Sequence, residues 1–129
     1  MGTLIDTQAF IWFFEDSSRL PAPVKAYMEK SSSLVVSIAS FWEITIKASL
    51  GKLVIPGGVA GVIDKALANG FKILPIERTH LITLSTLELI HRDPFDRIII
   101  AQAMSESMPL VSSDDVFWQY PISNVWKQC

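Results

Sequence analysis

Short apolar runs alternate with longer helical segments along this chain, and this alternation restricts its fold more than any other feature. Each run is too short and too rich in β-branched or aromatic residues to be a helix. We expect strands at residues 3–5, 34–36, 71–74, 110–111 and 122–125. Because strands separated by helices pair in parallel through right-handed crossovers, the pattern predicts an α/β fold. The expected form is a three-layer α/β/α sandwich with a small, mostly parallel central sheet.

Helical signals fill the intervals between these runs. Residues 59–67 place apolar side chains at i, i+3, i+4, i+7 and i+8, and Gly70 supplies a stop signal. Further helices are expected at 21–30, 40–50, 77–90 and 94–107. The last of these is so apolar that we expect it to be buried on more than one side.

Length and composition narrow the class of protein. The chain of 129 residues suits one domain, residues 1–129, and 50% hydrophobic against 19% charged residues excludes a disordered segment. Eleven basic and 13 acidic residues give a net charge of −2, which excludes charge-driven binding to duplexes as the main activity. One cysteine and two histidines cannot form a disulfide framework or a conventional structural zinc site.

The N-terminal residues bear on location. They carry no basic segment and include Asp6, so they do not resemble a secretory signal. The apolar run at 9–14 is far shorter than the roughly 20 residues of a membrane span. We therefore expect a cytoplasmic protein with no membrane partner.

Acidic residues follow the ends of the expected strands. Asp6 follows the first strand, and Asp114 follows the strand at 110–111. Glu43 lies in the first turn of the helix after the second strand, and Asp96 in the first turn of the helix at 94–107. In such sheets ligands collect beyond the carboxyl ends of the strands. We therefore expect one acidic pocket formed by Asp6, Glu43, Asp96 and Asp114.

Carboxylates gathered in this way repel one another and need a counter-charge at neutral pH, which a divalent cation supplies. Oxygen ligands without His or Cys select Mg²⁺ or Mn²⁺ over zinc. One or two such ions would lower the pKa of a bound water and neutralise charge on a phosphodiester. The four acids therefore predict metal-dependent nuclease chemistry, with the number of ions left open.

Each acid also has a structural explanation. Ser40 and Glu43 form a capping-box pattern, and Glu43 is spaced to pair with Lys47. Asp93 suits a helix N-cap, which places Asp96 in the first helical turn, where acids are favoured.

Asp114 or Asp115 would cap a short helix at 116–119. Asp6 is the hardest to explain structurally, because a carboxylate at the end of a buried strand costs several kcal/mol unless it is paired. No basic residue lies near it in the sequence.

Other polar residues near the acids are less distinctive. Lys47 and Arg97 would either contact phosphate or balance an acid, and we favour charge balance. We place His91 and Arg92 on an exposed loop and His80 on a solvated helix face.

Four segments carry a family resemblance. They are Leu4-Ile5-Asp6-Thr7, Ser40-Phe41-Trp42-Glu43-Ile44, His91-Arg92-Asp93-Pro94-Phe95-Asp96-Arg97 with Ile100-Ala101-Gln102-Ala103, and Leu110-Val111-Ser112-Ser113-Asp114. In this order, over nearly the whole chain, they resemble the PIN-domain ribonucleases, specifically the VapC-like toxins of bacterial toxin–antitoxin pairs. The Asp-Pro-Phe-Asp-Arg block is the most specific part.

The resemblance implies a PIN-like fold and a metal-dependent endoribonuclease that hydrolyses RNA with metal-activated water. It implies a homodimer and inhibition by a cognate antitoxin protein. Gln8 stands where relatives often carry His, but no acid is missing. The catalytic and metal-binding residues that the resemblance implies are Asp6, Glu43, Asp96 and Asp114.

Clustered large apolar residues indicate a binding partner independently of the family resemblance. Ile11-Trp12-Phe13-Phe14 fills a full helical turn, so at least one large side chain should point away from a single core face. Trp118 and Trp126 are similar cases. Either a small three-layer fold buries them all, or they form a surface that meets a second copy or the antitoxin.

Two other functions fit part of the pattern. A catalytically inactive PIN-like binding module would sequester a partner, but the intact acids argue against it. An aspartate-based phosphoryl-transfer protein would use Asp6 as its nucleophile, but phosphatases of this kind want a second Asp where Gln8 stands.

Overall fold

The computed structural model describes residues 2–128. Its strands are β1 (Thr3–Ile5), β2 (Leu34–Ser37), β3 (Lys72–Leu74) and β4 (Leu110–Val111). Its helices are α1 (Thr7–Phe14), α2 (Ala22–Lys30), α3 (Ile38–Ser49), α4 (Gly58–Ala68), α5 (Arg78–Thr86), α6 (Pro94–Glu106) and α7 (Val125–Gln128), with a 3₁₀ turn η1 (Asp115–Gln119).

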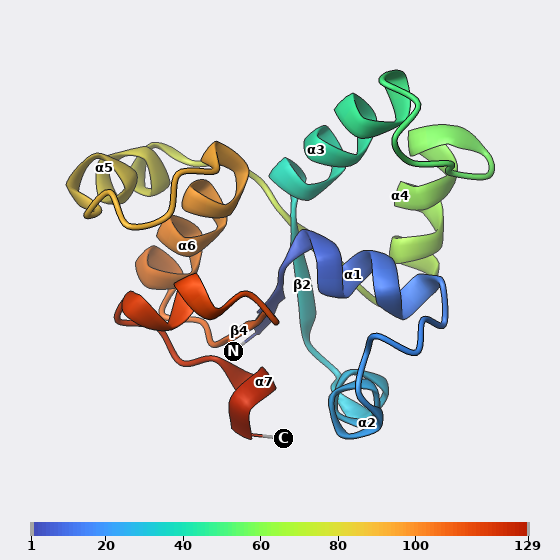
Figure 1. Cartoon of the computed structure of the whole chain (residues 1–129), viewed down its shortest axis with the longest axis horizontal. Coiled ribbons are helices and arrows are strands. Elements are labelled where there is room, and N and C mark those ends of the chain that lie inside the picture. Colours follow the sequence, from blue (N-terminus) through green and yellow to red (C-terminus); the bar gives the residue numbers. More distant parts are fainter. Residues whose placement is uncertain (1, 129) are drawn as a thin grey trace.

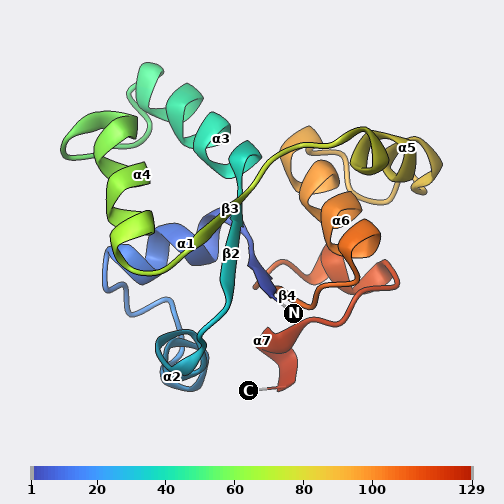
Figure 2. The ribbon, with the colours of Figure 1, turned by 180° about the vertical axis from the view of Figure 1, so that it is seen from behind.

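The four strands form one sheet in the order β3-β2-β1-β4, and every pair is parallel. Helices α1, α2 and α4 lie on one side of this sheet, and α5 and α6 lie on the other (Figure 1). The reverse view shows the same division (Figure 2). The predicted α/β/α sandwich is therefore confirmed.

Alternating side chains of the strands build two cores. Within β1, Ile5 packs among α1, α2 and α3, whereas Leu4 packs against α6 and η1. β4 divides in the same way between Val111 and Leu110. This alternation buries both faces of every central strand and leaves only the strand ends open for chemistry.

Helix α6 is buried as the sequence predicts. Its residues 98–103 are all buried, and Asp93 caps its start by accepting the N–H groups of Phe95 and Asp96 at 2.8 and 3.2 Å. This cap fixes where the helix begins and so where Asp96 lies.

In residues 2–128 no helix has both the length and the apolar character to cross a bilayer.

The expected strand at 122–125 is wrong. Asn124 makes only an isolated bridge to β4, and Val125 already begins α7. The Asn124 side chain accepts the Ser112 N–H, donates to the Ser112 carbonyl and accepts the Trp126 N–H. The Asn124 side chain thus uses backbone N–H and C=O groups that a fifth strand would otherwise pair with the chain beyond β4.

Helix α3 begins earlier than predicted. Ser37, not Ser40, is its N-cap and accepts the Ala39 N–H at 3.0 Å. Ser40 is buried inside the helix, where its hydroxyl accepts a hydrogen bond from Thr7 at 2.8 Å. The predicted capping box is therefore wrong, and Glu43 lies in the second turn of α3 rather than the first.

Helix α5 is shorter than the predicted 77–90, since it ends at Thr86. His80 is fully buried, so its predicted place on a solvated face is wrong. Its Nδ1 accepts the Glu77 N–H at 2.9 Å, and its Nε2 donates to Glu106 of α6 at 2.9 Å. The imidazole thus caps α5 and ties it to α6.

The aromatic turn at 11–14 is half-buried and packs against the core, and so does Trp126. The exposed large apolar side chains lie elsewhere. Several of them form a stripe on α3, at Ile38, Trp42, Ile46 and Leu50. The α3 stripe is therefore a second surface suited to a partner, in addition to the half-buried aromatic turn that the sequence pattern indicates.

Candidate active site

The carboxyl ends of the parallel strands open into one polar cavity. Its volume is about 280 Å³. It is lined by Asp6, Thr7, Gln8, Glu43, Lys47, Asp93, Asp96, Ser113 and Asp114. The structure therefore brings together all four acids singled out in the sequence, from four different elements.

Asp6 lies deepest, where β1 ends and α1 begins. Its Oδ1 accepts the Ala9 N–H at 2.7 Å as the N-cap of α1, and only 4% of the residue is exposed. Burial raises the pKa of Asp6 to about 6, against hydrogen bonds from Ser112 and Ala9 that lower it. Asp114 and Glu43 raise this pKa further by repulsion.

Glu43 reaches the cavity from α3. Its Oε2 pairs with Lys47 Nζ at 2.9 Å, the spacing expected one turn apart. Its Oε1 is buried and has no hydrogen-bond partner. A buried carboxylate oxygen without a donor costs free energy, so this atom is suited to a ligand that the polypeptide does not supply.

Asp96 projects from the first turn of α6. Burial raises the pKa of Asp96 to about 7, and repulsion from Asp93, Asp6 and Glu43 acts in the same direction, whereas His91 lowers it. Two carboxyl groups of one cavity thus hold their protons more tightly than carboxyl groups in water, mainly because they are buried.

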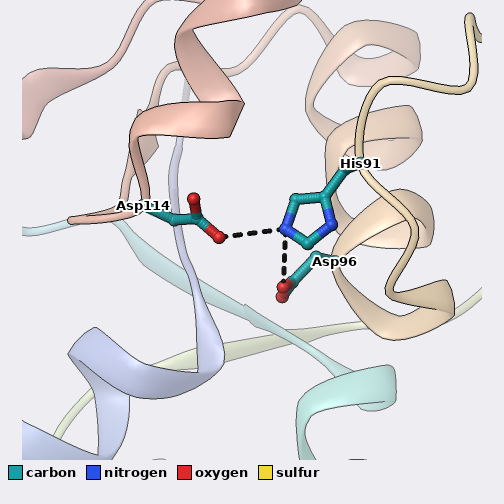
Figure 3. Close-up of side chains that lie close together, drawn as sticks. All are labelled: His91, Asp96 and Asp114. Atoms are coloured by element: carbon teal, nitrogen blue, oxygen red, sulfur yellow. Dashed lines mark hydrogen bonds and ion pairs between the residues drawn. The ribbon is translucent and has the colours of Figure 1, made fainter.

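Asp114 caps η1, accepting the Val116 N–H on its Oδ1 at 2.9 Å. Its Oδ2 turns the other way, toward α6 (Figure 3). The capping role expected for Asp114 and its place in the cavity therefore coexist, because its two oxygens serve different partners.

His91 stands between two of the acids. Its Nε2 lies 2.9 Å from Asp114 Oδ2 and 3.0 Å from Asp96 Oδ2 (Figure 3). Only 13% of its side chain is exposed, so the expectation of an exposed loop is wrong for this residue. The position of His91 depends on its contact with Asp114, which lies 23 residues further along the sequence.

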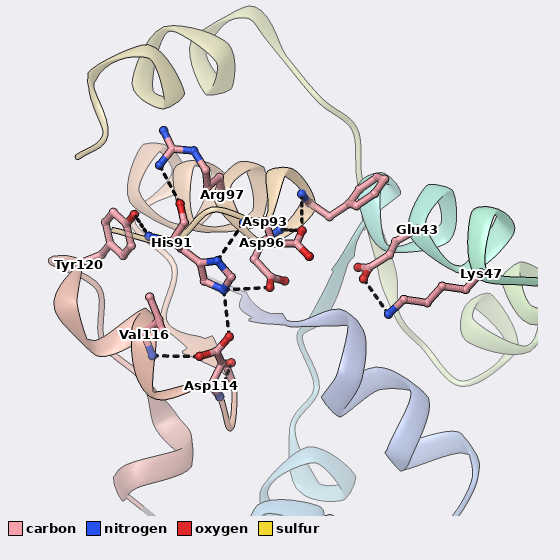
Figure 4. A network of polar contacts seen from close by, with 11 residues as sticks. Glu43, Lys47, His91, Asp93, Asp96, Arg97, Asp114, Val116 and Tyr120 are labelled. Atoms are coloured by element: carbon pink, nitrogen blue, oxygen red, sulfur yellow. Dashed lines mark hydrogen bonds and ion pairs between the residues drawn. The ribbon is translucent and has the colours of Figure 1, made fainter. Parts of the chain in front are cut away.

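The loop that carries His91 is held by a network (Figure 4). The Tyr120 hydroxyl accepts the His91 N–H at 2.9 Å and donates to the Glu88 carbonyl at 2.8 Å. Arg97 donates to the carbonyls of Glu88 and His91 at 3.1 and 3.2 Å. Arg97 thus fixes this loop through its carbonyls, a role that neither of its sequence-based interpretations included.

The donor set fits a hard divalent cation. It offers carboxylate oxygens from four elements, including the unpartnered Glu43 Oε1. Mg²⁺ and Mn²⁺ prefer such oxygens, and a bound cation would offset the burial and the repulsion that raise the pKa of Asp6 and Asp96. One atom each of His91, Asp96 and Asp114 also lies within 4.8 Å of the others, which brings a nitrogen to the edge of the acidic set.

Comparisons with known proteins agree with this geometry. The family model described as PIN domain matches residues 3–122. No curated protein matches the chain. Among solved structures, VapBC2 from Rickettsia felis bound to a promoter DNA fragment has a TM-score of 0.73 at 14% identity and covers 96% of this chain and 97% of that chain.

Two further structures share the fold. DNA-bound VapBC from Salmonella typhimurium has a TM-score of 0.73 at 16% identity, with 96% of each chain covered. A toxin–antitoxin complex from Klebsiella pneumoniae has a TM-score of 0.65 at 19% identity, with 93% of each chain covered.

Proposed function

Because this chain belongs to the PIN domain family, we propose that it is a VapC-like toxin that cleaves RNA as an endoribonuclease dependent on Mg²⁺ or Mn²⁺. One observation carries the proposal: Asp6, Glu43, Asp96 and Asp114 line a single cavity at the carboxyl ends of the strands. We assign these four residues to metal binding and catalysis.

The residues that line the cavity would have different roles in binding the cation and in positioning one another. A bound divalent cation would supply charge neutralisation for the phosphodiester and a more acidic water. Asp6, where β1 ends, and Asp96, in the first turn of α6, would hold the cation, while Glu43 would present its free Oε1 from the side of α3. Lys47 would keep the other Glu43 oxygen in place.

An antitoxin partner is the second part of the proposal. The solved structures with this fold include complexes titled VapBC and toxin–antitoxin. This chain offers such a partner an apolar cavity of about 470 Å³, to which Ile11 and Phe14 of α1 and Val62 of α4 contribute. The half-buried turn at 11–14 would then be covered in the complex.

A homodimer is the third part. The α3 stripe repeats every fourth residue, with Trp42 58% and Leu50 63% exposed. Exposed apolar area of this kind marks an interface in a small protein. We also propose that residues 1–129 form one domain and work in the cytoplasm, where RNA substrates and an antitoxin would meet them.

The dimer has a direct test. The double variant Ile46→Glu/Leu50→Glu places charge on the stripe without touching the buried core, so its mass by light scattering should fall to that of one chain. Leu67→Glu is the control, since Leu67 is also exposed but lies on α4. A wild-type protein that is already monomeric at micromolar concentration would refute the dimer.

Cleavage is the test of the main proposal. Purified protein incubated with total RNA and Mn²⁺ should produce discrete cuts, and EDTA in excess should abolish them. An inactive binding module would leave the RNA intact with or without metal. An aspartate-based phosphoryl-transfer protein would instead become labelled by an acyl phosphate donor, and such labelling without RNA cleavage would contradict the proposal.

A further inference from the structure

The imidazole of His91 is positioned more firmly than a loop side chain needs to be. Its ring packs edge-on against Phe117, with centroids 5.5 Å apart. Its backbone is held by Tyr120 and Arg97 (Figure 4). Its Nδ1 accepts the Asp93 N–H at 3.2 Å. The ring therefore has one orientation, set from several sides.

That orientation decides which nitrogen carries the hydrogen. Because Nδ1 accepts a backbone N–H, the hydrogen of the imidazole lies on Nε2. A histidine that binds a metal through Nε2 normally donates its other N–H to an acceptor, whereas His91 Nδ1 faces a donor. His91 is thus arranged to donate to Asp114 and to lie beside Asp96, not to bind an ion.

We propose that His91 is a positioning residue that limits this site to one cation. Its Nε2 lies between Asp96 Oδ2 and Asp114 Oδ2, 3.0 and 2.9 Å from the two oxygens, and donates its hydrogen to Asp114. Paired catalytic ions lie about 3.5–4 Å apart. A second ion placed between Asp96 and Asp114 would need these two oxygens, which already face the His91 Nε2. The inference rests on the proposed function, since it concerns the metal of that same cavity.

The remaining oxygens fit one ion. Asp114 Oδ1 is engaged by the Val116 N–H, and Asp6 Oδ1 by the Ala9 N–H. Glu43 Oε1 has no partner. Asp6 and Glu43 are the least exposed of the four acids, at 4% and 7%, so we place the single cation at this inner part of the cavity, beside Asp96. His91 contacts Asp114 at the outer edge, where 37% of the Asp114 side chain is exposed.

The test counts Mn²⁺ ions bound per chain, by equilibrium dialysis with electron paramagnetic resonance. His91→Gln keeps an N–H donor near the same place, whereas His91→Leu has similar bulk and no donor. We expect one Mn²⁺ in wild-type protein and in His91→Gln. We expect two in His91→Leu, with the broadened spectrum of a neighbouring Mn²⁺ pair.

Two Mn²⁺ in the wild-type cavity, none at all, or only one in a folded His91→Leu protein would overturn the inference. If His91→Leu loses the circular dichroism of the native fold, the number of Mn²⁺ ions bound by wild-type protein and by His91→Gln tests the inference, and two ions in either would contradict it. RNA cleavage by a wild-type protein that binds two ions would contradict the single-ion inference but not the proposed ribonuclease function. One bound ion without RNA cleavage would contradict the ribonuclease function but not the single-ion inference.

Discussion

Asp6→Asn should reduce RNA cleavage by more than about 1000-fold, the loss that follows removal of one essential catalytic group. The exchange removes the most buried carboxylate of the cavity, yet Asn caps helices as well as Asp does, so α1 should keep its start at Thr7. Initial rates on one defined RNA, with saturating Mn²⁺, measure the effect.

The same substitution should stabilise the metal-free protein. Burial holds the pKa of Asp6 at about 6, so its ionised form costs free energy at pH 8, where one pKa unit is worth 1.36 kcal/mol. Asn carries no charge, and we expect the free energy of unfolding to rise by about 1–2 kcal/mol in EDTA. Loss of activity with gain of stability would separate a catalytic role from a structural one.

Asp64→Asn is the matched control, because Asp64 is an exposed acid on α4 and does not line the cavity. It should leave both the cleavage rate and the stability unchanged. Equal cleavage by wild-type protein and Asp6→Asn would contradict the assignment of this carboxylate to the active site.

Acid should stabilise the metal-free protein. The folded-state pKa values of Asp6 and Asp96 are raised to about 6 and about 7, mainly by burial, while an unfolded Asp titrates near 3.9. Between these values the folded chain binds more protons than the unfolded chain, so the free energy of unfolding falls as the pH rises. From pH 5 to pH 8 we expect a loss of about 2–4 kcal/mol.

Urea unfolding in EDTA at successive pH values measures this profile. Saturating Mn²⁺ should flatten it and raise stability most at pH 8, because the cation binds the ionised carboxylates. The double variant Asp6→Asn/Asp96→Asn should also be flat, and should no longer respond to Mn²⁺. Stability that rises with pH in EDTA would contradict the raised pKa values of these two carboxyl groups.

The gathering of the four acids follows from sequence by one rule. Parallel strands direct their carboxyl ends to one edge, so Asp6 and Asp114, which follow β1 and β4, share that edge with the start of α6. Glu43 reaches the same edge from the second turn of α3. The strands and α6 were predictable for a related reason, since their periodicity and the Asp93 cap are local signals.

What sequence alone missed depends on contacts between distant segments. Ser37 and Ser40 both suit an N-cap, and only the contact between Ser40 and Thr7 distinguishes them. His80 is buried because Glu106 of a different helix receives its hydrogen bond. His91 meets Asp114 only after η1 folds back toward α6. No periodicity marks such pairs in advance.

The central claim is that the cavity lined by carboxylates from four elements holds one hard cation. Anomalous diffraction from crystals soaked in Mn²⁺ tests it most directly. We predict one strong peak inside the cavity, among the oxygens of Asp6, Glu43 and Asp96. An empty cavity at saturating Mn²⁺, or an ion held only outside it, would contradict the claim.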